Sequence, residues 1–261
     1  MAPSNPGSTG ALANPARGAP PPILTLERIS KRFGAIVIAD GLDLTLARGE
    51  ALGIIGPNGA GKTTLFGIAS GAVAPDSGRV LLDGADVTRL PPEKRCRLGI
   101  ARSYQIPQPF SGMTVFENLV VAACFAGNTR EREVYRPCLD TLERCGLAAK
   151  ANTMAGSLTL LDRKRLELAR GLATKPRVLL LDEVAGGLTE HECSALVALV
   201  RDIRRDGVSI IWIEHIVHAL IAVVDRLAVL HGGAIIAEGE PKSVVAAPRV
   251  QEIYMGIPAD A

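Results

Sequence analysis

The chain has 261 residues, of which 48% are hydrophobic and 3% aromatic, and its formal net charge is +2. This length can bury the core of one α/β domain, or of a domain with an added lobe. The near-neutral charge and scarce aromatics argue against a strongly basic nucleic-acid binder and against a base-stacking surface.

The cysteines and the N-terminal segment indicate the kind of compartment that the chain occupies. The five cysteines include no C-x-x-C pair and no metal-binding spacing, which predicts reduced, packed thiols in a cytosolic protein. Residues 1–22 are rich in Pro, Gly, Ala, Ser and Asn, so we expect a disordered tail rather than a signal peptide or an anchor. The apolar stretch 208–230 contains four polar interruptions, so we predict no membrane span; these are Glu214, His215, His218 and Asp225.

The first half of the chain begins with strand patterns. Short alternating segments at Ile23–Leu26 and Leu42–Leu46 predict antiparallel strands. The apolar run Ala51–Ile55 is typical of a buried strand, and Thr63–Ala69 is typical of a helix.

Between that strand and that helix lies a complete G-x-x-x-x-G-K-[ST] pattern, formed by Gly56, Pro57, Asn58, Gly59, Ala60, Gly61, Lys62, Thr63 and Thr64. Such a loop aims backbone N–H groups and a helix N-terminus at a polyphosphate. Lys62 supplies a positive charge for the β- and γ-phosphates, and the Thr63 hydroxyl can ligate Mg²⁺. The alternative is a Gly-rich turn that matches by accident, but the strand and helix on either side favour a nucleotide site.

After this loop the pattern becomes mainly helical and then returns to alternating strands and helices. Residues 78–84 predict a strand with a turn, and residues from about 90 to 174 are mainly helical. The order predicts an α/β nucleotide-binding core with a helical lobe inserted at about 106–174. The clearest segments are the helices Val115–Ala126, Val134–Cys145 and Glu190–Arg205 and the buried parallel strands Val178–Leu181 and Ser209–Ile213.

Two carboxylates, Asp182 and Glu183, follow one of these buried strands, at the edge where α/β proteins bind ligands. Asp182 would approach the metal, and Glu183 would orient or deprotonate a water. His215 closes the next strand and could contact a γ-phosphate. The alternatives are solvated acids at a strand end and an ordinary strand-end histidine.

In this order, these pieces resemble the ATP-binding subunits of ABC transporters over residues 23–258. The finer resemblance is to importers of branched-chain amino acids and related amides. It rests on four segments: Lys31–Gly34, Leu52–Thr64, Ile235–Pro241 and Val250–Gly256. The resemblance implies an α/β, ABC-type P-loop domain with a RecA-like core, an antiparallel β subdomain and an inserted helical subdomain.

The resemblance also implies roles that spacing alone does not give. Phe33 would stack on adenine, with a packed strand-end aromatic as the alternative. Gln105, in the Q-loop segment 101–105, would touch Mg²⁺ and the attacking water. His215 would be the switch histidine, and residues 186–189 would form the D-loop that meets a second subunit.

Two segments depart from the family pattern. The signature, usually Leu-Ser-Gly-Gly-Gln, is here Leu158, Thr159, Leu160, Leu161 and Asp162, just before a predicted helix over 163–174. In the family this segment caps the ATP that the other subunit holds. Leucine in place of glycine would be strained at a positive φ, and an acid beside a phosphate is unfavourable. The other departure is Val184 and Thr189, where Pro and Asp are usual.

The resemblance implies an ATP-hydrolysing motor subunit that uses ATP and Mg²⁺ on the cytoplasmic face of a membrane. Its expected partners are a second ATP-binding subunit in a heterodimer with one weak site, transmembrane permease subunits that contact residues 107–113, and indirectly an external solute-binding protein. Two alternatives stay open. One is a non-transport ABC ATPase that acts on nucleic acid or ribosomes, and the other is a degenerate nucleotide-binding regulator.

Overall fold

The computed structural model describes residues 22–255. The predicted disordered tail therefore lies outside the described residues except for Pro22, and so do residues 256–258 at the end of the resemblance. Among the described residues, no helix is both long and apolar enough to cross a membrane.

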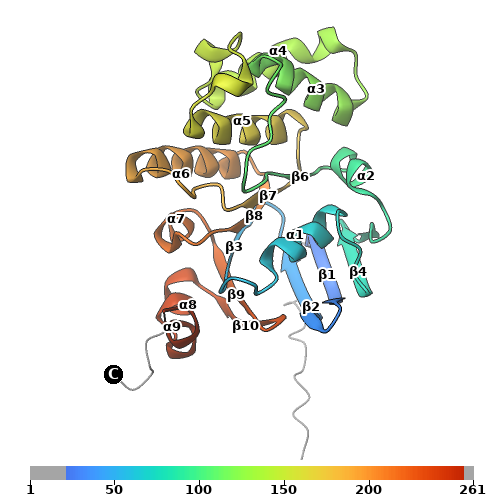
Figure 1. The fold of residues 1–261 in the computed structure, drawn as a ribbon. Helices are drawn as coiled ribbons and strands as arrows, with labels where there is room; N and C mark the ends of the chain where they lie inside the picture. The colour runs from blue at the N-terminus through green and yellow to red at the C-terminus, as the bar shows by residue number, and fades with distance from the viewer. Residues whose placement is uncertain (1–21, 256–261) are drawn as a thin grey trace, which may run out of the picture.

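A six-stranded sheet forms the centre of the molecule (Figure 1), in the order β10-β9-β3-β8-β7-β6. β3 pairs in parallel with β8 and β9, and β7 pairs in parallel with β8 and β6. The three buried strands that the sequence predicted are confirmed at this centre. The bounds are β3 Ala51–Ile55, β6 Ile100–Arg102, β7 Val178–Asp182, β8 Ser209–Ile213, β9 Arg226–His231 and β10 Ala234–Gly239.

Alternate residues of these strands enter two different cores. Leu179 and Leu181 of β7 pack in one buried cluster, whereas Val178 and Leu180 pack in the other. Successive side chains of a strand point to opposite faces, so an unbroken apolar run is what a sheet covered on both faces requires.

A second sheet, of order β2-β1-β4-β5, is antiparallel and lies on the side of the core where α1 packs (Figure 1). The two predicted antiparallel strands are confirmed, although both are longer than expected. The bounds are β1 Leu24–Phe33, β2 Ile36–Leu46, β4 Ser77–Leu82, β5 Ala85–Asp86 and α1 Lys62–Ser70.

The helices α3, α4 and α5 pack on one another at one end of the molecule (Figure 1). The predicted helices in this region are confirmed, but the short strand β6 lies inside the stretch that the sequence pattern described as mainly helical. β6 pairs with β7 and packs beside α5. The bounds are α2 Pro92–Arg97, α3 Val115–Gly127, α4 Glu131–Arg144, α5 Leu160–Ala173, with short 3₁₀ turns at Ala148–Lys150 and Ala155–Ser157.

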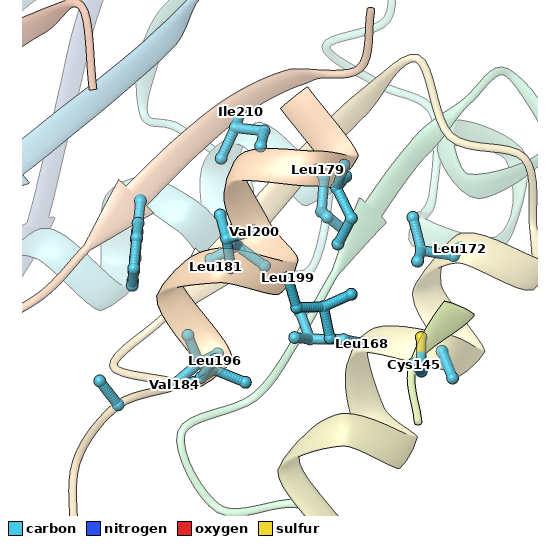
Figure 2. Close-up of a cluster of buried hydrophobic side chains, with 14 of the residues drawn as sticks. Cys145, Leu168, Leu172, Leu179, Leu181, Val184, Leu196, Leu199, Val200 and Ile210 are labelled. Atoms are coloured by element: carbon cyan, nitrogen blue, oxygen red, sulfur yellow. The ribbon is translucent and has the colours of Figure 1, made fainter. Parts of the chain in front are cut away.

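The remaining helices follow β7. Figure 2 shows α6 placing Leu196 and Val200 in the same buried cluster as Leu181 of β7 and Leu168 of α5. This cluster holds the end of β7, and therefore the residues after it, in a fixed position. The bounds are α6 Glu190–Arg205, α7 Val217–Ile221, α8 Pro241–Ala246 and α9 Pro248–Met255.

All five cysteines are free thiols, and three of them are buried. Burial raises the pKa of the Cys145 thiol to about 12 and that of Cys138 to about 11. These thiols stay protonated at neutral pH and are inert packing groups, as the sequence predicted.

Candidate functional site

The phosphate-loop pattern runs from the end of β3 into the first turn of α1, which begins at Lys62. Gly61 caps α1 with φ +96°, in the left-handed region that favours glycine. A Cβ at Gly56 would lie 2.2 Å from the backbone oxygen of Leu230, and one at Gly61 would lie 2.7 Å from the side chain of Ile38. The close packing of the loop against β9 and β2 therefore requires glycine at both positions.

The side chain of Lys62 is buried within this loop. Its ammonium donates hydrogen bonds to the carbonyl oxygens of Gly56, at 2.7 Å, and Pro57, at 3.0 Å. Burial lowers the pKa of Lys62, while the nearby carboxylates Glu183 and Asp182 act in the opposite direction. Lys62 is thus a positive charge held at the base of the loop.

A cavity of about 550 Å³ opens over the loop and gathers most of the predicted site residues. Its size suits a nucleotide, since ligand sites commonly occupy about 300–1,000 Å³. The lining consists of Ile38, Asn58, Gly59, Ala60, Gly61, Lys62, Thr63, Thr64, Gln105, Glu183 and His215. The structure therefore brings together the loop, the Q-loop glutamine, one strand-end carboxylate and the histidine.

Glu183 lies between Gln105 and His215 in this cavity wall. Its Oε2 accepts a hydrogen bond from the Gln105 amide at 2.5 Å, and its Oε1 lies 2.7 Å from Nε2 of His215. Because a carboxylate can only accept, His215 donates in this contact when Glu183 is ionised. Glu183 has φ +48°, a left-handed backbone conformation that is uncommon for a non-glycine residue. The turn directs its carboxylate toward the cavity.

Asp182 is buried directly behind this carboxylate. Its Oδ2 accepts a hydrogen bond from the Arg102 guanidinium at 2.9 Å, and its Oδ1 has no partner. Burial raises the pKa of Asp182, and the contact with Arg102 opposes that rise. A buried carboxylate oxygen without a partner costs free energy unless another ligand uses it.

Mg²⁺ fits this donor set. It is usually bound by one or two carboxylates together with substrate phosphates and waters. Across residues 22–255, no three His, Cys, Asp or Glu side chains form a ready-made metal site. The orphaned oxygen of Asp182 and the hydroxyl of Thr63, which is exposed at the start of α1, are suitable oxygen ligands.

Phe33 ends β1, and its side chain does not line the loop cavity. It is 51% exposed, and the Lys31 ammonium lies 5.2 Å from its ring centroid. The structure does not support the alternative of a packed strand-end aromatic. The stacking of Phe33 on adenine stays a prediction.

The signature segment lies apart from the loop cavity, and none of Leu158, Thr159, Leu160, Leu161 and Asp162 lines it. Thr159 caps α5, and its hydroxyl donates a hydrogen bond to the Asp162 carboxylate at 2.8 Å. Lys150 forms an ion pair with the same carboxylate, and Arg165 lies 3.8 Å away. Leu160 and Leu161 have no positive φ, so the expected backbone strain does not arise.

The second departure from the family pattern also has a local explanation. Thr189 is the N-cap of α6 and forms a capping box with Glu192. Val184 is buried in the cluster that holds the end of β7 (Figure 2). Val184 therefore stabilises the chain before residues 186–189, and Thr189 stabilises the helix that follows them.

Three charged residues beside Glu183 and Asp182 were not predicted from the sequence as site residues. Arg102 pairs with Asp182, Glu214 accepts a hydrogen bond from the Ala185 N–H, and Lys164 contacts the backbone of Glu183. Glu214 and Lys164 are buried. An acid at the end of an apolar strand was visible in the sequence, but its partners come from segments far apart in the chain.

A mostly parallel sheet with a phosphate loop after β3, and adjacent carboxylates at the end of β7 on the far side of β8, defines a P-loop nucleotide-binding protein. The comparisons with known proteins narrow this class. The family model described as ABC transporter matches residues 39–186.

Several relatives match nearly the whole chain. The high-affinity branched-chain amino acid transport ATP-binding protein BraF of Pseudomonas aeruginosa is 35% identical over 90% of this chain and 98% of its own length. The protein LivG of Escherichia coli, which has the same description, is also 35% identical with the same coverage. The lipopolysaccharide export system ATP-binding protein LptB of Acidithiobacillus ferridurans is 33% identical over 90% of this chain and 97% of its own.

Solved structures agree with this match. A crystal structure of an ABC transporter ATP-binding cassette in its ADP conformation superposes with a TM-score of 0.84 and 32% identity, over 91% of this chain and 100% of that chain. A nucleotide-free cassette superposes with a TM-score of 0.83. The chain belongs to the ABC transporter family and is an ATP-binding motor subunit, an ATPase cassette of that family.

Proposed function

We propose that this chain hydrolyses MgATP at the Lys62 loop and drives the import of branched-chain amino acids or similar amides. The observation that carries the catalytic part is the position of Glu183, between Gln105 and His215 at the wall of the loop cavity. A base held between two hydrogen-bonding side chains beside a phosphate loop is what water activation requires.

In this proposal the site residues share the work of binding the nucleotide, holding the metal and activating a water. The loop N–H groups and Lys62 bind the phosphates, and Phe33 stacks on adenine. Thr63, Asp182 and Gln105 hold Mg²⁺, which when bound neutralises phosphate charge. Glu183 orients a water and takes its proton. His215 and Gln105 fix the Glu183 carboxylate, and His215 responds to the γ-phosphate.

The transported solute is argued from the relatives. BraF and LivG are described as branched-chain amino acid transport proteins, whereas LptB, at 33% identity, belongs to a lipopolysaccharide export system. A cassette of this kind thus serves different cargoes, so the segments that match the importer group favour the amino acids. Uptake of labelled leucine, compared with uptake of a charged amino acid, in cells with and without this chain tests the assignment.

A groove of about 380 Å³, lined by residues of α2, β6, α3 and α5, supports a permease as the membrane partner. Three exposed aromatic side chains line it: Tyr104, Phe110 and Phe125. Arg170 stacks on Phe110 at 5.1 Å, and Arg97 stacks on Phe125 at 4.8 Å. An apolar floor with a cationic rim suits a short helix from a permease on the cytoplasmic face, with the solute-binding protein acting only through that permease.

The signature segment supports a second, non-identical cassette as the ATPase partner. In the family this segment caps the ATP of the other subunit, but here the Thr159 hydroxyl and Asp162 bond to each other. Asp162 also puts a carboxylate where a phosphate would approach. A heterodimer in which this chain's own site is the active one and the partner's site is weak follows from this asymmetry.

The decisive experiment measures ATP hydrolysis by the full chain, alone and with co-expressed partner cassette and permease subunits. We expect turnover that needs the partners and that falls about 100-fold or more in Glu183→Gln, as expected for loss of a catalytic base. The hydrogen bond between Thr159 and Asp162 in the signature segment also favours a second candidate function, a nucleotide-binding regulator. Tight ATP binding without hydrolysis in every mixture would establish that candidate instead.

A further inference from the structure

A buried carboxylate, Glu214, lies behind the pair formed by Glu183 and His215. Glu214 is the residue between the end of β8 and His215, and its side chain is 1% exposed. Its Oε1 accepts a hydrogen bond from the Ala185 N–H at 2.6 Å, and its Oε2 accepts one from the His215 N–H at 3.0 Å. One carboxylate therefore binds the backbones of both segments that carry the pair.

Lys164 reaches the same place from α5. It is 4% exposed, and its ammonium donates a hydrogen bond to the carbonyl oxygen of Glu183 at 3.4 Å. The N–H of Glu183 is bound to the carbonyl of Ile213 at the end of β8. Both backbone groups of Glu183 are thus held, one by the central sheet and one by α5, the helix that begins within the signature segment.

The charges of these groups depend on one another. Burial lowers the pKa of Lys164, and the negative charges of Glu214 and Glu183 counteract that effect. Burial raises the pKa of Glu214, and its three backbone donors counteract that effect. Buried charges persist only where they are paired or hydrogen-bonded, and neither residue touches the loop cavity.

We infer that Glu214 and Lys164 are positioning residues for hydrolysis, which keep the Glu183 carboxylate in reach of the attacking water. Glu183 has a left-handed backbone conformation that costs free energy, and such conformations persist only when the surroundings impose them. Glu214 fixes the turn after Glu183 to the turn that carries His215, and Lys164 fixes the Glu183 carbonyl to α5. The burial of Val184 in the cluster of Figure 2 supports the same turn by packing.

This inference rests on the proposed role of Glu183, and it differs from a purely structural role in what it predicts. A structural role would make variants less stable without changing the turnover of the folded molecules. A positioning role lowers kcat while leaving the KM for ATP unchanged, because Lys62 and the loop bind the nucleotide independently.

The test compares Glu214→Gln, Lys164→Met and Lys164→Arg in the full chain, assembled with its partner cassette and permease subunits. Glutamine keeps the shape of Glu214 but presents an N–H₂ in place of one of the two accepting oxygens, and methionine keeps the stem of Lys164 without its charge. We expect kcat per folded molecule to fall about tenfold in Glu214→Gln and severalfold in Lys164→Met, with KM within about twofold. Arginine should restore most of the loss, since it keeps a buried donor.

Glu50→Gln is the matched control. Glu50 is also a mostly buried carboxylate that accepts a backbone N–H, from Ala47 at 2.7 Å, and it pairs with Arg226 before the start of β3, away from the cavity lining. It should lower the melting temperature and leave kcat unchanged. If Glu214→Gln fails to fold, the two Lys164 variants carry the test alone.

Glu183→Gln, measured in the same assembly, separates two kinds of failure. If that variant keeps near-normal turnover, the proposed role of Glu183 is wrong. If it loses turnover while folded Glu214→Gln and Lys164→Met keep a normal kcat, or show only a raised KM, the positioning inference alone is overturned.

Discussion

The loop cavity and the signature segment are the two regions that face nucleotide in this family, and in this chain they are built in opposite ways. In the loop cavity, glycine stands where close packing demands it, and the polar groups of Gln105, Glu183 and His215 meet at the cavity wall. In the signature segment, the Thr159 hydroxyl donates a hydrogen bond to the Asp162 carboxylate. Under the proposed function, the chain would therefore offer more polar groups to its own ATP than to a partner's.

The largest effect is expected from removing the loop cation. Lys62→Met keeps the apolar stem but deletes the charge beside the phosphates, and it also frees the carbonyls of Gly56 and Pro57. We expect ATP affinity to weaken about 100-fold, near 2.7 kcal/mol, measured by titration of the full chain with a fluorescent ATP analogue. Lys94→Met, on α2, should bind ATP as the native chain does; equal binding by both variants would contradict the proposed site.

A change of intermediate size in ATP turnover is expected when the signature segment is changed to the residues that are usual in the family. Replacing Leu160 and Leu161 by glycine and Asp162 by glutamine frees the Thr159 hydroxyl and removes the carboxylate from the phosphate's path. We expect the turnover of the assembled complex to rise severalfold, because a phosphate is then bound without charge repulsion. The same replacements in a complex that carries Glu183→Gln should reveal the activity of the partner's site by itself. A fall in turnover would show that the altered segment is needed as it stands.

The two regions also differ in how well the sequence predicted them. β3, β8 and α6 were predicted with the bounds that the structure gives, because each is an unbroken apolar run or a strongly periodic helix with a threonine cap. The loop, Asp182 and Glu183 were singled out because a short local pattern contains their chemistry, whereas the role of His215 was implied by the family resemblance.

Other features depend on contacts between segments that are distant in the sequence. β6 has three residues, too few for a periodic pattern, and exists because β7 pairs with it. The contacts of Arg102, Lys164 and Glu214 leave no pattern in the sequence, and they appear only when β6, α5 and β8 meet around Asp182 and Glu183. The hydrogen bond between Thr159 and Asp162 was likewise not expected, since the resemblance implied only that this segment caps the ATP of the other subunit.

The stability that Asp162 contributes in the signature segment should depend on pH in the acid range. Burial opposes ionisation of Asp162, but the hydrogen bonds from Lys150 and Thr159 prevail, so its pKa lies below the ordinary value. Its contribution to stability is fully present above the unfolded-state pKa of about 3.9 and disappears as the pH falls through the lower folded pKa. We expect the gap in unfolding free energy between the native chain and Asp162→Asn to be constant from neutral pH to about pH 5 and to shrink below about pH 4. A gap that does not change with pH would mean that Asp162 is not ionised in the folded chain.

The smallest effects concern two helix caps that are chemically alike. Thr159 caps α5 and Thr189 caps α6, and each hydroxyl also donates to an acid three residues later. Replacement of either threonine by alanine should cost about 1 kcal/mol in urea unfolding. We expect the larger cost at Thr159, because its acceptor, Asp162, is buried, whereas a hydrogen bond to the more exposed Glu192 is readily replaced by water. If Thr159→Ala leaves ATP turnover unchanged while it lowers stability, the hydroxyl serves the helix and not the partner's phosphate. A large loss of turnover with little loss of stability would instead show that Thr159 leaves Asp162 and contacts ATP when the subunits close.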